Sequence, residues 1–156
     1  MTIIRTMIAL SMLALAAACG GGDSTSVPRA EPAGASSADI GDHVVHFNAL
    51  STDQLPPDIA SAYGIKRSKN NAMLNVSVIR KSDNAAVPAK VDVKTKNLTG
   101  QLKNITMRQI DEQDAIYYIG DTTIANRETL VFDISVIPEG STRASEVRFK
   151  REFFAD

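Results

Sequence analysis

The sequence predicts an all-β domain, an antiparallel β sandwich of about seven strands with one short helix. Two observations lead to this fold class. From about residue 42 onward, short runs alternate apolar and polar residues with a period of two, as half-buried strands do. Turn-forming residues separate these runs at short intervals, which favours antiparallel strands over the long crossovers of a parallel sheet.

The strands are expected in chain order at residues 43–50, 73–81, 88–97, 101–110, 115–124, 129–137 and 145–154, of which the fourth is the least regular. Pro88 at the start of the third run is compatible with an edge strand, because proline cannot donate a ladder hydrogen bond. Gly120 within the fifth run favours a β bulge.

One short helix is expected over residues 56–64. Proline stands at its start, Asp58 lies in the first turn and Gly64 stands at the end, which is the usual punctuation of a helix. Ile59 and Tyr63 are four residues apart and would share one face. We expect this helix to cover one end of the sandwich.

Composition limits the classes of partner. The net charge of −1 lacks the basic excess of nucleic-acid-binding proteins, so no nucleic acid is expected as a partner. The chain has no tryptophan, so its core must be built mainly from aliphatic side chains, phenylalanine and methionine. Its 156 residues suit one domain plus accessory segments.

Residues 1–18 are predicted to be a lipoprotein signal peptide. The apolar run Met7–Ala18 is shorter than the roughly 20 residues that a spanning helix needs. Small residues, Ala16 to Ala18, directly precede Cys19, and this arrangement resembles the lipobox at which bacterial lipoproteins are cleaved and acylated on the cysteine thiol. A plain secretory peptide cleaved after Ala18 and an uncleaved anchor are the alternatives, and the length of the run disfavours the second.

Two features bear on the expected lipid anchor and its membrane. Lipoboxes prefer leucine three places before the cysteine, whereas here Leu15 lies four places before Cys19. Gly20 follows the cysteine where, by similarity to enteric sorting rules, an aspartate would favour retention in the inner membrane. The sequence therefore predicts a cell-envelope protein, anchored by lipid to the periplasmic face of the outer membrane.

Residues 19–41 are expected to form the lipidated N-terminus and a disordered tether, and residues 42–156 the β-sandwich domain. The tether is rich in Gly, Ser, Ala and Pro, and such a composition buries too little apolar surface to offset the entropy of ordering. A flexible chain of this length spans roughly 25 Å on average.

Several short sequence segments of the domain occur together in one known family. The chain resembles the proteobacterial family called domain of unknown function 4426 over about residues 42–154. This resemblance implies an exported protein with an immunoglobulin-like β sandwich, and it brings no catalytic, cofactor-binding or metal-binding residue. The segments that carry it are Gly41-Asp42, His46 to Leu50, Ala62 to Ile65, Arg67 to Asn70, Leu98 to Leu102, Asp114 to Ile119 and Pro138 to Gly140.

The favoured binding surface is the basic stretch after the predicted helix, where Lys66, Arg67 and Lys69 follow Tyr63. These cations could hold an anionic group, such as a lipid phosphate, a glycan carboxylate or an acidic face of a partner. The alternative is a solvated connection between helix and strand, since three charges fall short of a typical basic patch.

Other polar groups suggest no catalytic or metal site. His43 and His46 are three apart on a strand and would point to opposite faces. Asp111 to Asp114 lack the ligand spacing and central glycine of a calcium loop, so a charged hairpin turn is the better interpretation. No nucleophile elbow, zinc-protease, P-loop or dinucleotide-binding motif occurs, and no cofactor is expected.

Three functional hypotheses follow. The favoured one is a non-enzymatic binding module, tethered to the membrane, for an envelope protein or a cell-wall component. The second is an enzyme that modifies an envelope polymer with carboxylates on loops, and it predicts a cleft containing an acid of raised pKa. The third is a carrier of a small ligand inside the sandwich, which would need a large apolar cavity.

Overall fold

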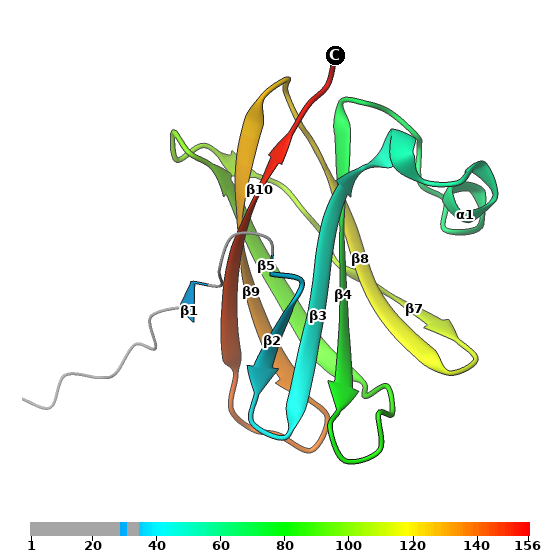
Figure 1. Ribbon diagram of the computed structural model, residues 1–156, viewed down its shortest axis with the longest axis vertical. Coiled ribbons are helices and arrows are strands. Elements are labelled where there is room, and N and C mark those ends of the chain that lie inside the picture. Colours follow the sequence, from blue (N-terminus) through cyan, green and yellow to red (C-terminus); the bar gives the residue numbers. More distant parts are fainter. Residues whose placement is uncertain (1–28, 31–34) are drawn as a thin grey trace, which may run out of the picture.

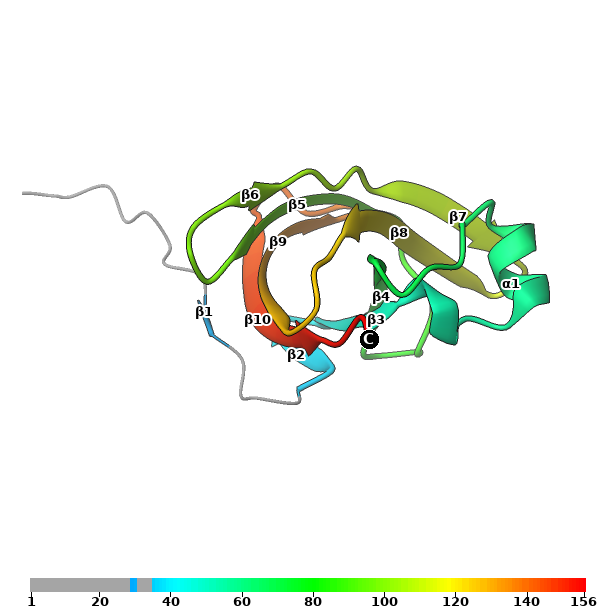
Figure 2. The same ribbon diagram turned by 90° about the horizontal axis from the view of Figure 1, so that it is seen from above.

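The computed structural model describes residues 29–30 and 35–156, and these form two facing five-stranded sheets (Figures 1 and 2). The first sheet has the spatial order β1 (Arg29–Ala30), β10 (Ser145–Phe153), β9 (Glu128–Pro138), β5 (Ala89–Asn97) and β6 (Leu102–Lys103). The second has the order β2 (Ser37–Ile40), β3 (His43–Ser51), β4 (Asn71–Arg80), β8 (Ala115–Thr123) and β7 (Arg108–Glu112). Only the two-residue strand β1 pairs in parallel among these strands, so the predicted antiparallel sandwich is confirmed.

The structure adds short strands to the predicted set. The irregular fourth run holds β6 and β7, which are joined by residues 104–107 without strand structure. β2 falls in the segment expected to be tether, where it pairs with β3 and buries Ala38. Ordered structure therefore begins before residue 42, and β1 lies still further upstream. The predicted signal peptide, Cys19 and most of the predicted tether lie outside the described residues.

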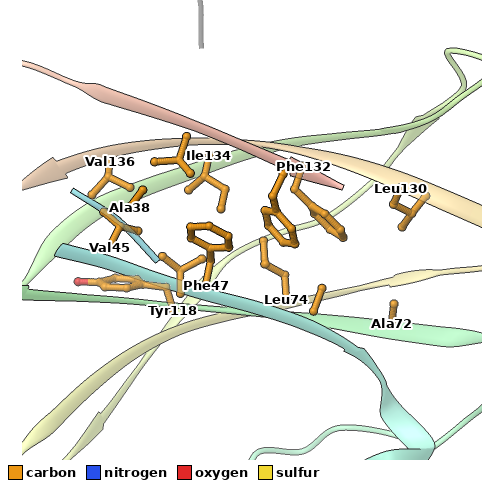
Figure 3. Close-up of a cluster of buried hydrophobic side chains, with 14 of the residues drawn as sticks. Ala38, Val45, Phe47, Ala72, Leu74, Tyr118, Leu130, Phe132, Ile134 and Val136 are labelled. Atoms are coloured by element: carbon orange, nitrogen blue, oxygen red, sulfur yellow. The ribbon is translucent and has the colours of Figure 1, made fainter. Parts of the chain in front are cut away.

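The core lies between the sheets and is dominated by aliphatic and phenylalanine side chains (Figure 3). Three of its aromatic rings form a stack. The ring of Phe149 on β10 stacks against Phe47 on β3 with centroids 4.7 Å apart, and against Phe132 on β9 with centroids 4.9 Å apart. Because these rings come from both sheets, the stack joins the two layers.

The short helix is confirmed as α1 (Pro57–Ala62), preceded by the 3-10 turn η1 (Thr52–Gln54). Its expected position at one end of the sandwich is wrong. Ala60 and the flanking residues pack on Met73 and Ile119, whose side chains alternate along β4 and β8 with core residues. The helix therefore covers part of the outer face of the second sheet. No helix in residues 29–30 and 35–156 is long and apolar enough to cross a membrane.

Gly120 does not mark a bulge, so that expectation is also wrong. The register between β4 and β8 runs without interruption past the pair Leu74 and Gly120. Instead, the glycine allows the segment 105–107 to approach β8 closely. A Cβ atom at Gly120 would lie 2.8 Å from both Met107 Sδ and the Thr106 carbonyl oxygen, and 2.9 Å from Ile105.

We expect Gly120→Ala to destabilise the domain by about 1–3 kcal/mol, because a backbone oxygen must move to admit the methyl group. In an unobstructed strand the same change would stabilise, since glycine loses more backbone entropy than alanine on folding. Urea unfolding of the two proteins measures the difference. An unchanged or increased unfolding free energy would show that residues 105–107 do not press on β8.

Candidate functional site

In the structure, the side chains of the predicted basic binding surface do not gather at one site. Arg67 donates to the Asp53 carbonyl oxygen at 2.7 Å, and Lys69 donates to the carbonyl oxygen of Asp156 at the C-terminus. Tyr63 donates to Glu112 on β7 instead. Together with the exposed Lys66, these side chains contact three different parts of the chain and do not converge on one point.

Buried hydrogen bonds explain why this loop takes its path. The Thr52 hydroxyl, fully buried, donates toward the carbonyl oxygens of Lys66 and Ser68, and it accepts from the Ser68 N–H at 2.9 Å. The bond from Tyr63 to Glu112 raises the pKa of the Tyr63 phenol to about 12, with burial and the charge of Glu112 adding to the effect. These contacts are typical of a structural connection between helix and strand.

The remaining sequence-predicted groups also have structural roles. His43 is buried and its Nδ1 lies 2.7 Å from Asp42, whereas His46 is exposed, so the two histidines point to opposite faces as predicted. Residues 113–114 form the turn between β7 and β8, which confirms the charged hairpin. Within the described part of the chain, no three His, Cys, Asp or Glu side chains gather as metal ligands would.

A groove of about 750 Å³ lies along β5. Its size is within the range of ligand-binding sites in proteins. One wall is the irregular segment 105–107, which Gly120 allows to sit close to β8. Figure 2 shows the chain passing from β6 to β7 alongside β5. The other lining residues come from the first sheet, and they are Val91, Asp92, Val93, Lys94, Asp133, Ser135 and Glu146.

Backbone hydrogen bonds show which groups of β5 face the groove. The Glu139 N–H donates to the Pro88 carbonyl oxygen at 2.7 Å, which places Ala89 in a non-hydrogen-bonded pair with β9. Bonding directions alternate along a strand, so the N–H and C=O groups of Val91 and Val93 also point away from β9. No backbone group of the described residues pairs with them.

Two contacts close the ends of this unpaired stretch. The Ala89 N–H donates to the hydroxyl of the buried Tyr118 at 2.7 Å. At the other end, Thr95 pairs with Lys103 of β6. Between them, Lys90–Lys94 has no neighbouring strand on the groove side in the described structure, and five residues of strand span about 17 Å. We call Lys90–Lys94 the open edge.

Charge alternates along the exposed face of the open edge. Lys90, Asp92 and Lys94 all point outward, and the Lys90 ammonium lies 3.4 Å from the Asp92 carboxylate. Asp133, which also lines the groove, is paired with Arg148. The apolar side chains of Val91 and Val93 point the other way, toward the core.

A largely buried ion pair holds the hairpin that ends the open edge. Glu128 lies 2.9 Å from Lys103, and it also accepts from the Asn97 amide at 3.0 Å and from the Ala125 N–H at 2.8 Å. Burial alone would raise the pKa of Glu128, but Lys103 and the two N–H donors outweigh it and hold the pKa below its usual value. The β5–β6 hairpin is thus fixed to the start of β9.

The groove is not visible in the sequence. Pro88 correctly indicated an edge position, and the alternation of Lys90, Asp92 and Lys94 showed which face of the strand is exposed. Nothing in the local pattern shows that β6 covers only the last part of β5. That fact depends on how residues 104–107 cross to the second sheet.

The fold and the groove together define a small antiparallel β sandwich with an unpaired edge. The family model described as "Domain of unknown function (DUF4426)" matches residues 37–156, and the chain belongs to this family, as the resemblance implied. The crystal structure of a DUF4426 family protein from Pseudomonas aeruginosa PAO1 is 37% identical, with a TM-score of 0.67, and the match covers 77% of this chain and 94% of that chain. A search of curated proteins found no match.

Proposed function

We propose that the chain is a lipid-anchored protein of the bacterial envelope, held on the periplasmic face of the outer membrane, which binds another molecule without catalysing a reaction. The lipobox at Cys19 supports the anchor. The open edge inside a groove of ligand-binding size supports the binding role, and it is the observation on which the proposal chiefly depends. The groove replaces Tyr63, Lys66, Arg67 and Lys69 as the proposed binding surface.

An enzyme acting on an envelope polymer is the second candidate, because Asp92, Asp133 and Glu146 line the groove. Two of these carboxylates already have cationic partners in Lys90 and Arg148. Catalysis by paired carboxyl groups needs one of them protonated, which requires a raised pKa. Because two of the three carboxylates are held by cations, we favour binding.

Acylation is tested by mass measurement of the mature N-terminus and by incorporation of an alkyne-labelled fatty acid in cells. We expect the mature chain to begin at Cys19 and to carry the label, and Cys19→Ala to remove the label completely. A mature chain that begins elsewhere, or an unlabelled thiol at Cys19, would contradict the proposed anchor.

Binding is tested in cells with a photo-crosslinking amino acid at position 94 in the groove or at position 66 in the loop after α1. We expect an adduct of one defined mass from position 94 and none from position 66, since both positions are exposed but only the first lies in the groove. Adducts from position 66 alone would restore the basic loop as the binding surface. Release of soluble cell-wall fragments by the purified protein would favour the enzyme.

A further inference from the structure

We infer that the groove takes an extended polypeptide segment, which adds to β5 as a new edge strand. This inference rests on the proposed function and names the class of partner. Its physical basis is the open edge, where two residues present unpaired N–H and C=O groups in one direction. Strand addition satisfies such groups with main-chain hydrogen bonds, whereas a globular ligand leaves their regular spacing unused.

The length of the open edge suits one short strand. Tyr118 closes it at Ala89 and β6 closes it at Thr95, so an added strand has defined limits at both ends. Residues 105–107 stand along the groove as its far wall. A segment bound in the groove would therefore lie between β5 and residues 105–107.

Charge defines the complementary sequence. On the exposed face, an added strand places side chains beside Lys90, Asp92 and Lys94. Opposite charges directly across a strand pair stabilise it and like charges destabilise it. The favoured partner therefore carries acidic, basic and acidic residues at alternate positions, with apolar residues between them that face the side of Val91 and Val93. This pattern reads the same in both chain directions, so it serves parallel and antiparallel addition.

The probe is a blocked peptide, Ser-Thr-Glu-Val-Lys-Val-Glu-Thr-Ser, titrated into the ¹⁵N-labelled processed chain as purified from the cell in detergent. We expect amide shifts centred on Val91 and Val93. The charge-reversed peptide Ser-Thr-Lys-Val-Glu-Val-Lys-Thr-Ser should bind about tenfold more weakly, because three cross-strand pairs change sign. In antiparallel addition the two valines carry the N–H groups that bond to Val91 and Val93, so a peptide with proline at both positions should not bind in that direction.

Two protein variants locate the effect. Asp92→Lys should weaken binding of the first peptide by about threefold to tenfold, and it should strengthen binding of a peptide with glutamate at the central position by a similar factor. Asp111→Lys changes an exposed acid on β7, which is the edge strand of the other sheet, and should leave both affinities unchanged. Because Asp92 is exposed, folding of this variant is not at risk.

Val93→Pro removes a groove-facing N–H and spares the ladder of β5 with β9, because those bonds come from the alternate residues. It also replaces a side chain that packs against the core, so folding must be checked. It should abolish binding of every peptide, and its amide spectrum shows whether it folds. If Val93→Pro does not fold, the change in peptide preference caused by Asp92→Lys still tests whether peptides bind along the open edge.

Three outcomes would overturn the inference: no amide shift at millimolar peptide, shifts centred on β7, or equal affinity for the two charge patterns. Shifts at Val91 and Val93 that depend on protein concentration without peptide would also overturn it, in favour of a second copy. If the peptides fail while crosslinks from position 94 persist in cells, the proposed function stands and its ligand is not a strand. If the crosslinks fail while the peptides bind, the open edge is competent but the proposed function is wrong.

Discussion

Phe132→Ala should lower the free energy of unfolding by about 3–5 kcal/mol, the largest single effect on stability that we expect. Phe132 is fully buried between the sheets (Figure 3), and its ring stacks on Phe149. Removing the ring leaves a cavity that two sheets held by backbone ladders cannot easily close. Small domains have a total stability of about 5–15 kcal/mol, so this variant loses a large part of it.

Urea denaturation and thermal melting measure this loss, and we expect the melting temperature to fall by roughly 10–20 °C. Phe132→Leu keeps most of the side-chain volume and should lower the unfolding free energy by less. This variant still tests the prediction if Phe132→Ala does not fold. Leu102→Ala is the matched control, because Leu102 is 76% exposed and its loss should change stability by less than about 0.5 kcal/mol. A cost of Phe132→Ala no larger than that of Leu102→Ala would contradict the described core.

The second large effect is expected at the largely buried ion pair of Glu128 and Lys103, next to the β5–β6 hairpin. Glu128→Ala should destabilise by about 2–4 kcal/mol, because it leaves the Lys103 ammonium and the Ala125 N–H without their partner. The side chains of Glu128 and Lys103 are only 10% and 14% exposed, so water offers little replacement. Glu128→Gln combined with Lys103→Met should cost less than Glu128→Ala, since no charge is then left buried.

The pH dependence of this pair has a definite sign. Because the fold lowers the pKa of Glu128 from its ordinary value of 4.5, the carboxylate contributes stability above about that pH. This contribution is lost as pH falls through the lowered pKa of the folded state. The difference in unfolding free energy between wild type and Glu128→Gln should therefore be largest near neutral pH and shrink in acid. A difference that does not change between neutral and acidic pH would show that Glu128 is not ionised in the pair.

The sandwich was predictable because its long strands carry their own pattern. In β9, for example, Leu130, Phe132 and Ile134 face the core in alternation with Val131 and Asp133, and this period of two is visible in the sequence. β2 has no comparable signal. It buries one side chain, Ala38, and is held mainly by its ladder with β3, so a composition of small and polar residues suggested tether instead.

The groove could not be predicted because it depends on contacts between distant segments. The glycine at position 120 suggested an irregularity in β8. Its actual role is to leave space for residues 105–107, and this could be predicted only by knowing which segment crosses β8 there. The basic stretch at Lys66 to Lys69 was the most visible charge cluster in the sequence. Hydrogen bonds from Thr52 and to Asp53 give it a structural role that no local pattern shows.

The two-residue strand β1 sets how far the domain can travel if Cys19 carries the proposed lipid. Arg29, which lies ten residues after Cys19, is paired with Val147 of β10. A fully extended chain of ten residues reaches roughly 35 Å. Without this pairing, the covalent leash to Ser37 would allow roughly 60 Å. Pairing of β1 with β10 thus shortens the free chain between the lipid and the domain. This nearly halves the largest distance from the bilayer at which the domain can bind a partner.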